Sequence, residues 1–168
     1  TAAGPAFEGA RISQGMRASA GAIEKVAVAG GRLRTHVIGN VPPVGLCGSA
    51  LIDAAAELLR HGVLNAQGRL LPPDELPDAT PDDLRARVVV DNGKTAFTLA
   101  DAAEAAGGRP VLLTQRDVRE LQLASGALRA GILVLLKRAG LAPADLDAVL
   151  LAGGFGNYLR RSNAQRIG

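Results

Sequence analysis

A glycine-rich turn near the end of the chain is the clearest chemical signal in the sequence. The apolar run 148–151 leads directly into the turn 153–156. Glycines that a buried strand delivers to the edge of a sheet carry no Cβ atoms, so a flat ligand can lie directly on the backbone there. The spacing is not a dinucleotide fingerprint, because Leu159 stands where a third glycine belongs, and no Gly-Lys-Ser/Thr follows to make a P-loop. The same pattern is also typical of a plain structural turn.

A second candidate is the segment 45–49, where a helix is expected to begin. Free backbone N–H groups at a helix N-terminus suit an anion such as a phosphate. Cys47 lies in this segment, and a thiol at a helix start can be activated as a nucleophile. A single cysteine among small residues is more typical of buried packing, and we expect that role for Cys47.

The carboxylates show no pairing that would single out a general acid and a general base. Two of them have simpler interpretations, since Asp91 stands in a turn and Asp117 at a helix start. The histidines, His36 and His61, fall in a strand and at a helix end, so no Ser-His-Asp arrangement follows from them. The carboxylate candidates are Glu8, Asp53, Asp91, Asp117, Glu120 and Asp147.

The composition limits the function classes. The 168 residues are 48% hydrophobic and 21% charged, which excludes a disordered chain. A single cysteine excludes a disulfide framework and a metal or iron–sulfur site built from several thiolates of this chain, so we predict no metal ligands. Aromatic residues make up only 2%, and the arginines behind the net charge of +3 are scattered, which argues against nucleic-acid binding.

The ends and the hydropathy suggest where the chain works. No apolar run approaches the roughly 18 residues that a membrane helix needs, and the first residues lack the pattern of a signal peptide. We therefore expect a cytoplasmic protein with neither a membrane nor a nucleic acid as partner. Met16 is the only methionine, which predicts that the chain is a piece of a longer protein.

The elements that position these residues follow from periodicity and turn signals. A helix is predicted over residues 5–20, and a hairpin with a two-glycine turn over 24–38. A second helix begins near Ser49 and ends at Gly62. The proline-rich stretch 70–85 is expected to be a surface excursion that is not part of the core.

The second half contains a further hairpin and a long helix. The Asn92-Gly93 pair predicts the hairpin turn, a helical turn is expected over 100–106, and the apolar residues 111–113 lead into the long helix. Thr114 and Asp117 form its capping box, and Gly140 ends it.

The last part of the chain is predicted to contain a strand and a short helix. Residues 148–151 are expected to form a buried strand that runs into the glycine turn. Ser162 and Gln165 then predict a capping box that opens the final helix.

Four blocks of the chain together carry a family resemblance. They are TAAGPAFEGARISQGMRASAGAIE (1–24), PPVGLCGSALIDAAAELL (42–59), TQRDVRELQLASGALRAGI (114–132) and LLAGGFGNYL (150–159). In this order they resemble the C-terminal domain of the reductive activators of corrinoid proteins. These activators are ferredoxin-linked ATPases whose large domain belongs to the acetate and sugar kinase, heat-shock cognate and actin (ASKHA) superfamily. The resemblance covers nearly the whole chain apart from the proline-rich stretch.

The resemblance implies an α/β fold and an ATP-dependent activity. Residues 1–168 would form part of a ribonuclease-H-like domain, the second lobe of a pair, with a mixed sheet and flanking helices and truncated at both ends. The full protein would bind ATP with Mg²⁺ and move an electron from a 2Fe-2S cluster, held in a domain outside this chain, to an inactive corrinoid on a partner protein. This chain alone is expected to be inactive, and a homodimer is left open.

The resemblance also implies roles for particular residues. The turn residues Gly153, Gly154, Phe155 and Gly156 match the adenosine motif of the superfamily. The adenosine is expected to be lined by the start of the long helix, through Gln115, Arg119 and Gln122. Glu8 is the one catalytic candidate, because its loop would face the phosphates. Three positions depart from the family pattern, namely Ala50, Ser125 and Arg160.

Two other functions stay open at this stage. A phosphotransferase of the same superfamily would act on a sugar or an acyl substrate. An actin-like module would bind nucleotide without any electron transfer. An upstream group of four cysteines at ferredoxin spacing would exclude the phosphotransferase, and ATP-dependent polymerisation would favour the actin-like module.

Overall fold

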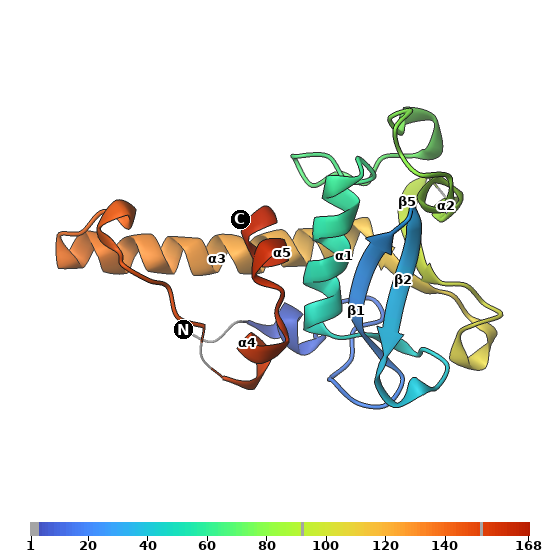
Figure 1. Ribbon diagram of the computed structural model, residues 1–168, viewed down its shortest axis with the longest axis horizontal. Coiled ribbons are helices and arrows are strands. Elements are labelled where there is room, and N and C mark those ends of the chain that lie inside the picture. The colour runs from blue at the N-terminus through green and yellow to red at the C-terminus, as the bar shows by residue number, and fades with distance from the viewer. Residues whose placement is uncertain (1–3, 92, 152) are drawn as a thin grey trace.

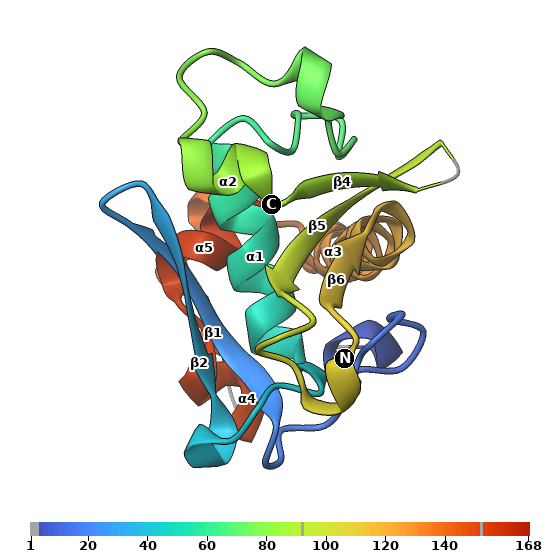
Figure 2. The same cartoon turned by 90° about the vertical axis from the view of Figure 1, so that its right-hand side faces the viewer.

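One buried helix lies between two small sheets in the computed structural model, which describes residues 4–91, 93–151 and 153–168 (Figure 2). The first sheet has the order β2-β1-β3, with β1 antiparallel to β2 and parallel to β3. The second sheet has the order β4-β5-β6 and is antiparallel throughout. The strands are β1 (Ala22–Ala29), β2 (Arg32–Val37), β3 (Gly45–Leu46), β4 (Val88–Asp91), β5 (Lys94–Ala100) and β6 (Val111–Thr114).

The central helix is α1 (Gly48–Arg60), and nearly every residue of it is buried. Apolar side chains on more than one face of a helix can pack against more than one layer, which is why α1 lies between two sheets. The expected helix is confirmed, and Gly62 follows it with a φ of 73°. The N-cap is Cys47, two residues before Ser49, near which the sequence predicts it.

Both predicted hairpins are confirmed. Gly30 and Gly31 have φ values of 58° and 74°, which suit the tight turn between β1 and β2. Asp91 pairs with Lys94 across the second turn, while Asn92 lies outside the described residues. The apolar residues expected only as a lead-in to the long helix form β6, because β5 offers them a hydrogen-bonding edge.

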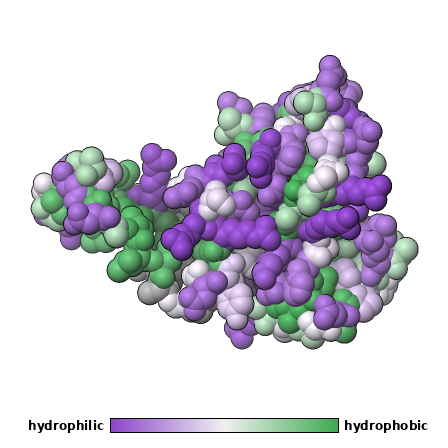
Figure 3. Space-filling model, viewed as in Figure 1, coloured by the Kyte–Doolittle hydropathy of each residue, from purple (hydrophilic) through white to green (hydrophobic). Residues whose placement is uncertain are grey.

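The long helix α3 (Gln115–Ala139) extends from the body of the molecule like an arm (Figure 1). Its predicted capping box between Thr114 and Asp117 is present, and Gly140 ends it in the left-handed region. Val118 and Leu121, in its first turns, are buried in the core. The helix and the segment that runs back from it expose large apolar side chains, many of which gather on this arm (Figure 3). They are Leu123, Ile132, Leu133, Val134, Leu135, Leu141, Leu146, Val149, Leu150 and Leu151.

The predicted strand at 148–151 is wrong for the described structure. These residues are not assigned to a strand, and Leu150 is 88% exposed. An apolar run becomes a buried strand only where another strand offers its free N–H and C=O groups. None of the strands in the described part of the chain pairs with this segment.

The predicted first helix over 5–20 is also wrong. Only the short 3₁₀ helix η1 (Pro5–Glu8) forms, and Gly9 ends it with a φ of 83°. The chain then turns through Arg11, which has a φ of 67°, and forms a bridge between Gly15 and Leu46. Left-handed residues within the segment interrupt the helix that its spacing predicts.

The last helices are short. Gly153 precedes α4 (Gly154–Tyr158), and α5 (Arg161–Arg166) follows it. The expected capping box of Ser162 is not formed, because α5 has Arg160 as its N-cap and Ser162 lies within its first turn. The remaining helix is α2 (Asp82–Ala86), and the remaining 3₁₀ turns are η2 (Ile38–Asn40), η3 (Pro73–Glu75), η4 (Ala106–Gly108) and η5 (Pro143–Asp145). The helical turn expected over 100–106 is confirmed by the bond from the Ala105 N–H to the Asp101 carbonyl, and η4 follows it.

The proline-rich stretch 70–85 contributes to the core, against expectation. Leu70, Leu76 and Leu84 are buried, and they join the cluster around α1. The prolines and acidic residues between these leucines predict a polar surface segment. An irregular segment can nevertheless be held on the core by a few buried apolar side chains. Within the described residues, none of the helices is both long and apolar enough to cross a bilayer.

Candidate functional site

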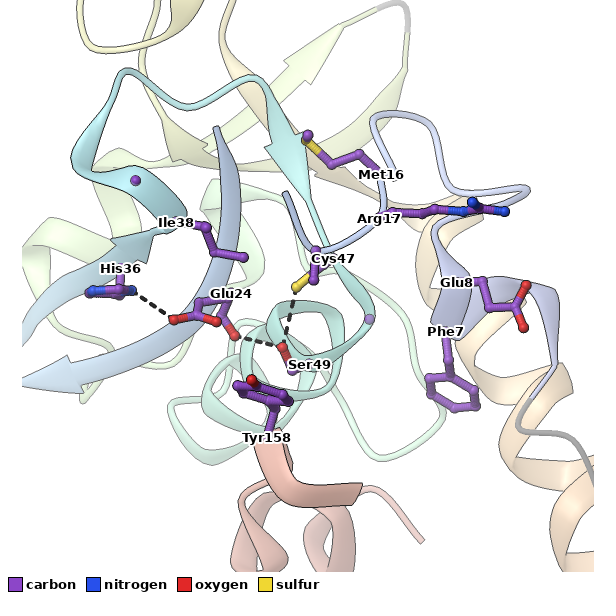
Figure 4. Close-up of a pocket in the computed structure, with 13 residues that line it drawn as sticks. Phe7, Glu8, Met16, Arg17, Glu24, His36, Ile38, Cys47, Ser49 and Tyr158 are labelled. Atoms are coloured by element: carbon purple, nitrogen blue, oxygen red, sulfur yellow. Dashed lines mark hydrogen bonds and ion pairs between the residues drawn. The ribbon is translucent and has the colours of Figure 1, made fainter. Parts of the chain in front are cut away.

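A cavity of about 820 Å³ opens where the N-terminal loop, the first sheet and the start of α1 meet (Figure 4). Glu8 and Arg17 reach it from the N-terminal loop, and Tyr158 reaches it from the end of α4. The other polar or titratable side chains at its wall are Glu24, His36, Cys47 and Ser49. The structure therefore brings the one catalytic candidate, Glu8, to the same cavity as the tyrosine that follows the glycine turn.

Hydrogen bonds order one side of this cavity. His36 Nδ1 lies 3.0 Å from Glu24 Oε1, in an ion pair that forms when the imidazole is protonated. The Ser49 hydroxyl donates to the Glu24 carbonyl at 2.8 Å, and Cys47 Sγ lies 3.3 Å from Ser49 Oγ (Figure 4). Cys47 is buried beside these groups, which agrees with the packing role predicted for it. The described residues contain no group of three or more His, Cys, Asp or Glu side chains that could hold a metal ion.

Glycines fix the N-terminal loop against the start of α1. A Cβ atom added at Gly48 would overlap the Phe7 carbonyl, and one added at Gly45 would overlap the Gln14 carbonyl. A Cβ atom at Gly15 would overlap the Gly9 carbonyl within the loop itself. The first two blocks of the sequence resemblance thus pack on each other backbone to backbone, and this contact leaves no room for a side chain at the glycines.

Asp117 ties the same loop to the start of α3. Its carboxylate is fully buried, and Oδ1 accepts from the Ser13 N–H at 2.7 Å and from the Ser13 hydroxyl at 3.0 Å. Oδ2 accepts from the Thr114 N–H at 2.9 Å and from the Thr114 hydroxyl at 2.8 Å. The Gln14 side chain adds bonds to Leu112 N–H and the Pro110 carbonyl. Asp117 is therefore more than the helix cap that the sequence predicts.

The side chains expected to line the adenosine bind another loop. Gln115 uses both ends of its amide there, donating to the Gly68 carbonyl at 2.7 Å and accepting from the Leu70 N–H at 2.8 Å. Gln122 donates to the Gln67 carbonyl and accepts from Arg119. These contacts join the start of α3 to the 65–70 loop, and the structure does not bring the three side chains together with the glycine turn.

The glycine turn has one residue with an open side. Gly153 has φ and ψ of 98° and 167°, a conformation essentially restricted to glycine. A Cβ atom added there would meet no atom within 4 Å, so a flat group can approach the backbone. Gly156 is different, because a Cβ atom there would lie 3.2 Å from the Leu151 carbonyl, which makes it a packing glycine. The side chain of Phe155 and the burial of Gly154 lie outside what the structure describes.

An adenine nucleotide fits these features in two respects. The open backbone at Gly153 leaves room for a flat ring, and Tyr158 lines a cavity large enough for a small ligand. That this turn holds the adenosine stays a prediction.

Asp83, in α2, binds the hairpin formed by β1 and β2. It accepts from the Leu33 N–H at 2.8 Å and lies 3.2 Å from Arg87 Nε. Burial alone would raise the pKa of the Asp83 carboxyl, but the bond from Leu33 and the charges of Arg87 and Arg32 outweigh it and lower that pKa.

The sequence does not single out Asp53 among the carboxylates, but in the structure it is buried and hydrogen-bonded to two distant segments. Its carboxylate accepts from Val26 N–H in β1 and from the Asn163 amide in α5. A polar residue at every fourth position of an otherwise apolar helix, Ser49, Asp53 and Glu57, was the available signal.

The whole chain, residues 1–168, matches the family model described as the C-terminal domain of RACo, the ASKHA domain. The chain belongs to this family. The match confirms the family resemblance and the α/β fold class that the four blocks predict.

The relatives carry names that agree with one another. The chain is 42% identical over its full length to the "Corrinoid activation enzyme RamQ" of Eubacterium limosum, of which it covers 28%. It is 28% identical, over 99% of its length, to the "[Co(II) methylated amine-specific corrinoid protein] reductase" of Methanosarcina barkeri, of which it covers 29%. A solved structure titled "Reductive activator for corrinoid,iron-sulfur protein" matches 96% of the chain with a TM-score of 0.78 and 34% identity. This chain covers 25% of that structure's chain, so it spans between a quarter and a third of these relatives' lengths.

Proposed function

We propose that this chain is the nucleotide-binding C-terminal domain of an ATP-dependent activator that returns an inactive corrinoid protein to its reduced state. The observation that carries the proposal is the full-length match at 42% identity to a corrinoid activation enzyme. Two further relatives, one of them a solved structure, carry names for the same kind of reaction. A sugar or acyl phosphotransferase and an actin-like module have no comparable support.

The reaction moves one electron. In the proposed cycle a 2Fe-2S cluster, in a domain outside this chain, is oxidised by one electron, and the Co(II) of the partner's corrinoid is reduced to Co(I). ATP with Mg²⁺ would supply the free energy that makes this uphill transfer favourable. This chain would hold the adenosine end of the nucleotide on the Gly153 turn and would direct Glu8 toward the phosphates.

The exposed apolar arm supports the proposal that residues 1–168 are part of a larger domain. Monomeric proteins rarely expose a large contiguous apolar surface unless something binds it. The relatives are more than three times as long as this chain. We infer that other parts of the same polypeptide cover α3 and pair with residues 148–151, which completes the second lobe.

The experiment is a reduction assay with the full-length protein, its corrinoid protein and a low-potential reductant. The absorbance of the Co(II) corrinoid should be replaced by that of Co(I) only when ATP and Mg²⁺ are present. Equal rates with and without ATP would contradict the proposal. Phosphate transfer from ATP to a sugar or an acyl group, with no change in cobalt absorbance, would favour the phosphotransferase instead.

A further inference from the structure

Asp53 is a buried carboxylate with three partner residues, which come from two separate parts of the chain. It lies in the middle of α1 and is 3% exposed. Asp53 Oδ2 accepts from the Val26 N–H of β1 at 3.2 Å, and Oδ1 accepts from the Asn163 side-chain amide of α5 at 2.6 Å. Arg160 Nε, just before α5, lies 3.6 Å from Oδ2. A buried charge with this many partners is costly to disturb from any one side.

Side chains of α1 bind the backbone of β1 along the part of its edge that β3 does not pair with. β2 covers one edge of β1, whereas β3 pairs with the other edge only at Ala22 and Ile23. Beyond that point α1 takes over, with the Ser49 hydroxyl on the Glu24 carbonyl and the Asp53 carboxylate on Val26 N–H. Four helical residues rise about 6 Å and two strand residues about 6.7 Å, so successive turns of α1 meet alternate residues of β1.

The contacts of Asp53 with Arg160 and Asn163 attach the C-terminal segment, residues 153–168, to α1. The Arg160 guanidinium also donates from Nη1 to the Val26 carbonyl at 3.3 Å, so both edge groups of Val26 are bonded. Asn163 is itself buried, in a helix of only six residues that could not be stable alone. Figure 1 shows α5 lying beside α1 and α4 below α5, both far from the tip of the α3 arm.

We propose that Asp53 is a positioning residue that holds this segment, and with it the Gly153 turn and Tyr158, against α1 and the cavity. Asp53 touches no ligand in this scheme and acts through Arg160 and Asn163. Its effect on nucleotide binding rests on the proposed function, whereas its effect on the docking of the segment does not. The arrangement also gives the arginine at position 160, a departure from the family pattern, a partner of opposite charge.

The pair of Asp53 and Asn163 can be exchanged, which gives a sharp test in the full-length protein. Asn163→Asp sets two carboxylates where one carboxylate and one amide now meet, and like charges at this distance repel. The double variant D53N/N163D restores one carboxylate and one amide. The amide oxygen introduced in α1 can accept from Val26 N–H, while the NH₂ of the same amide donates to the new carboxylate in α5. Two quantities are measured, the hydrogen exchange of peptides within 153–168 and the ATP concentration at half-maximal thermal stabilisation.

Asn163→Asp should speed exchange within 153–168 by about tenfold or more and raise the ATP midpoint by about tenfold, since an unmet buried charge costs at least one factor of ten. Exchange in β5 should stay unchanged, and the double variant should recover both quantities to within about threefold of the original protein. Unchanged exchange in N163D would overturn the proposal, as would a loosened segment whose ATP midpoint does not move. A double variant no better than N163D would overturn it too.

Control variants distinguish a local effect on 153–168 from a general loss of stability and from failure of the proposed function. If N163D loosens β5 as well, Arg160→Gln serves as the milder variant, because Arg160 is partly exposed and its loss does not bury a new charge. Arg161→Gln, the exposed neighbour, should change neither quantity and is the matched control. If the unaltered protein gains no stability from ATP, the proposed function fails, and the exchange of 153–168 alone decides whether Asp53 holds the segment.

Discussion

Replacing Asp117 by asparagine should release the N-terminal loop that carries Glu8 from the start of α3. The change keeps the size of the side chain but leaves a single acceptor oxygen. The carboxylate now accepts from two backbone N–H groups, those of Ser13 and Thr114, on different oxygens. In the variant at least one of these partly buried donors faces an NH₂ group and loses its partner.

The size of the effect follows from those contacts. An unpaired N–H that is only partly buried costs about 1 kcal/mol, the lower end of the range for buried groups, and a weakened helix cap adds about 1 kcal/mol. The two hydroxyls of Ser13 and Thr114 can rotate and accept instead, so they add little. The expected loss is therefore about 2 kcal/mol, which corresponds to local exchange that is roughly 30-fold faster.

The assay is hydrogen exchange by mass spectrometry on the full-length protein, read on peptides that cover 9–16 and 111–121. Asp145→Asn is the matched control, because Asp145 also accepts from the backbone N–H three residues before it, that of Ala142, but is exposed. That control should change local exchange by less than about threefold. Asp117→Asn with unchanged exchange at 9–16 would refute the claim that this carboxylate holds the loop.

Three further outcomes are expected. Gly48→Ala should destabilise the domain by about 1–3 kcal/mol and lower its melting temperature, because the added methyl group overlaps the Phe7 carbonyl, and an unchanged melting temperature would contradict that packing. Asp83→Asn should cost under about 1 kcal/mol at pH 7. Because the folded pKa of Asp83 is lowered, its contribution is present above the usual aspartate pKa of about 3.9 and is lost as the pH falls, so melting curves of the two proteins should converge in acid, and a constant difference would refute this. Cys47→Ser should leave the iron–sulfur absorbance of the full-length protein unchanged, since Cys47 is buried packing, and loss of the cluster would contradict that role.

Local signals in the sequence predict those elements that depend on their own residues. The two hairpins turn at glycines with positive φ, and α3 begins at its capping box and ends at Gly140, as expected. Such signals act within a few residues, so neighbouring structure does not override them. The family resemblance likewise rests on short blocks, and the whole-chain match confirms it.

Elements that depend on a distant partner could not be predicted in this way. The run 148–151 reads as a buried strand, but burial requires an edge that the described strands do not offer. Residues 5–20 have helical spacing, yet contacts with Leu46, Gly48 and Asp117 hold them as a loop. No periodicity reports such long-range contacts.

The sequence indicates some residues of the candidate site, whereas others depend on distant contacts. Sequence singled out Glu8 and the glycine turn, and the cavity contains Glu8 together with Tyr158, which follows that turn. The adenosine-lining role of Gln115, Arg119 and Gln122 stays a prediction, and their observed bonds go to the 65–70 loop. Asp53 depends on residues up to 110 positions away, so sequence spacing alone could not identify its partners.

The most direct test of the account is the ATP-dependent melting temperature of the full-length protein and of Gly153→Ala. A ligand that binds only the folded state at 100 times its Kd stabilises it by about 2.7 kcal/mol. A Cβ atom at Gly153 meets nothing within 4 Å, so the alanine does not clash inside the domain, although a φ of 98° and a ψ of 167° strain any residue but glycine. Gly4→Ala, at another open glycine with a φ of 99° and a ψ of 160°, controls for that strain. The account predicts an ATP-dependent rise in the unaltered protein and in Gly4→Ala, and its loss or at least a tenfold higher ATP midpoint in Gly153→Ala. An unchanged midpoint in Gly153→Ala would contradict it.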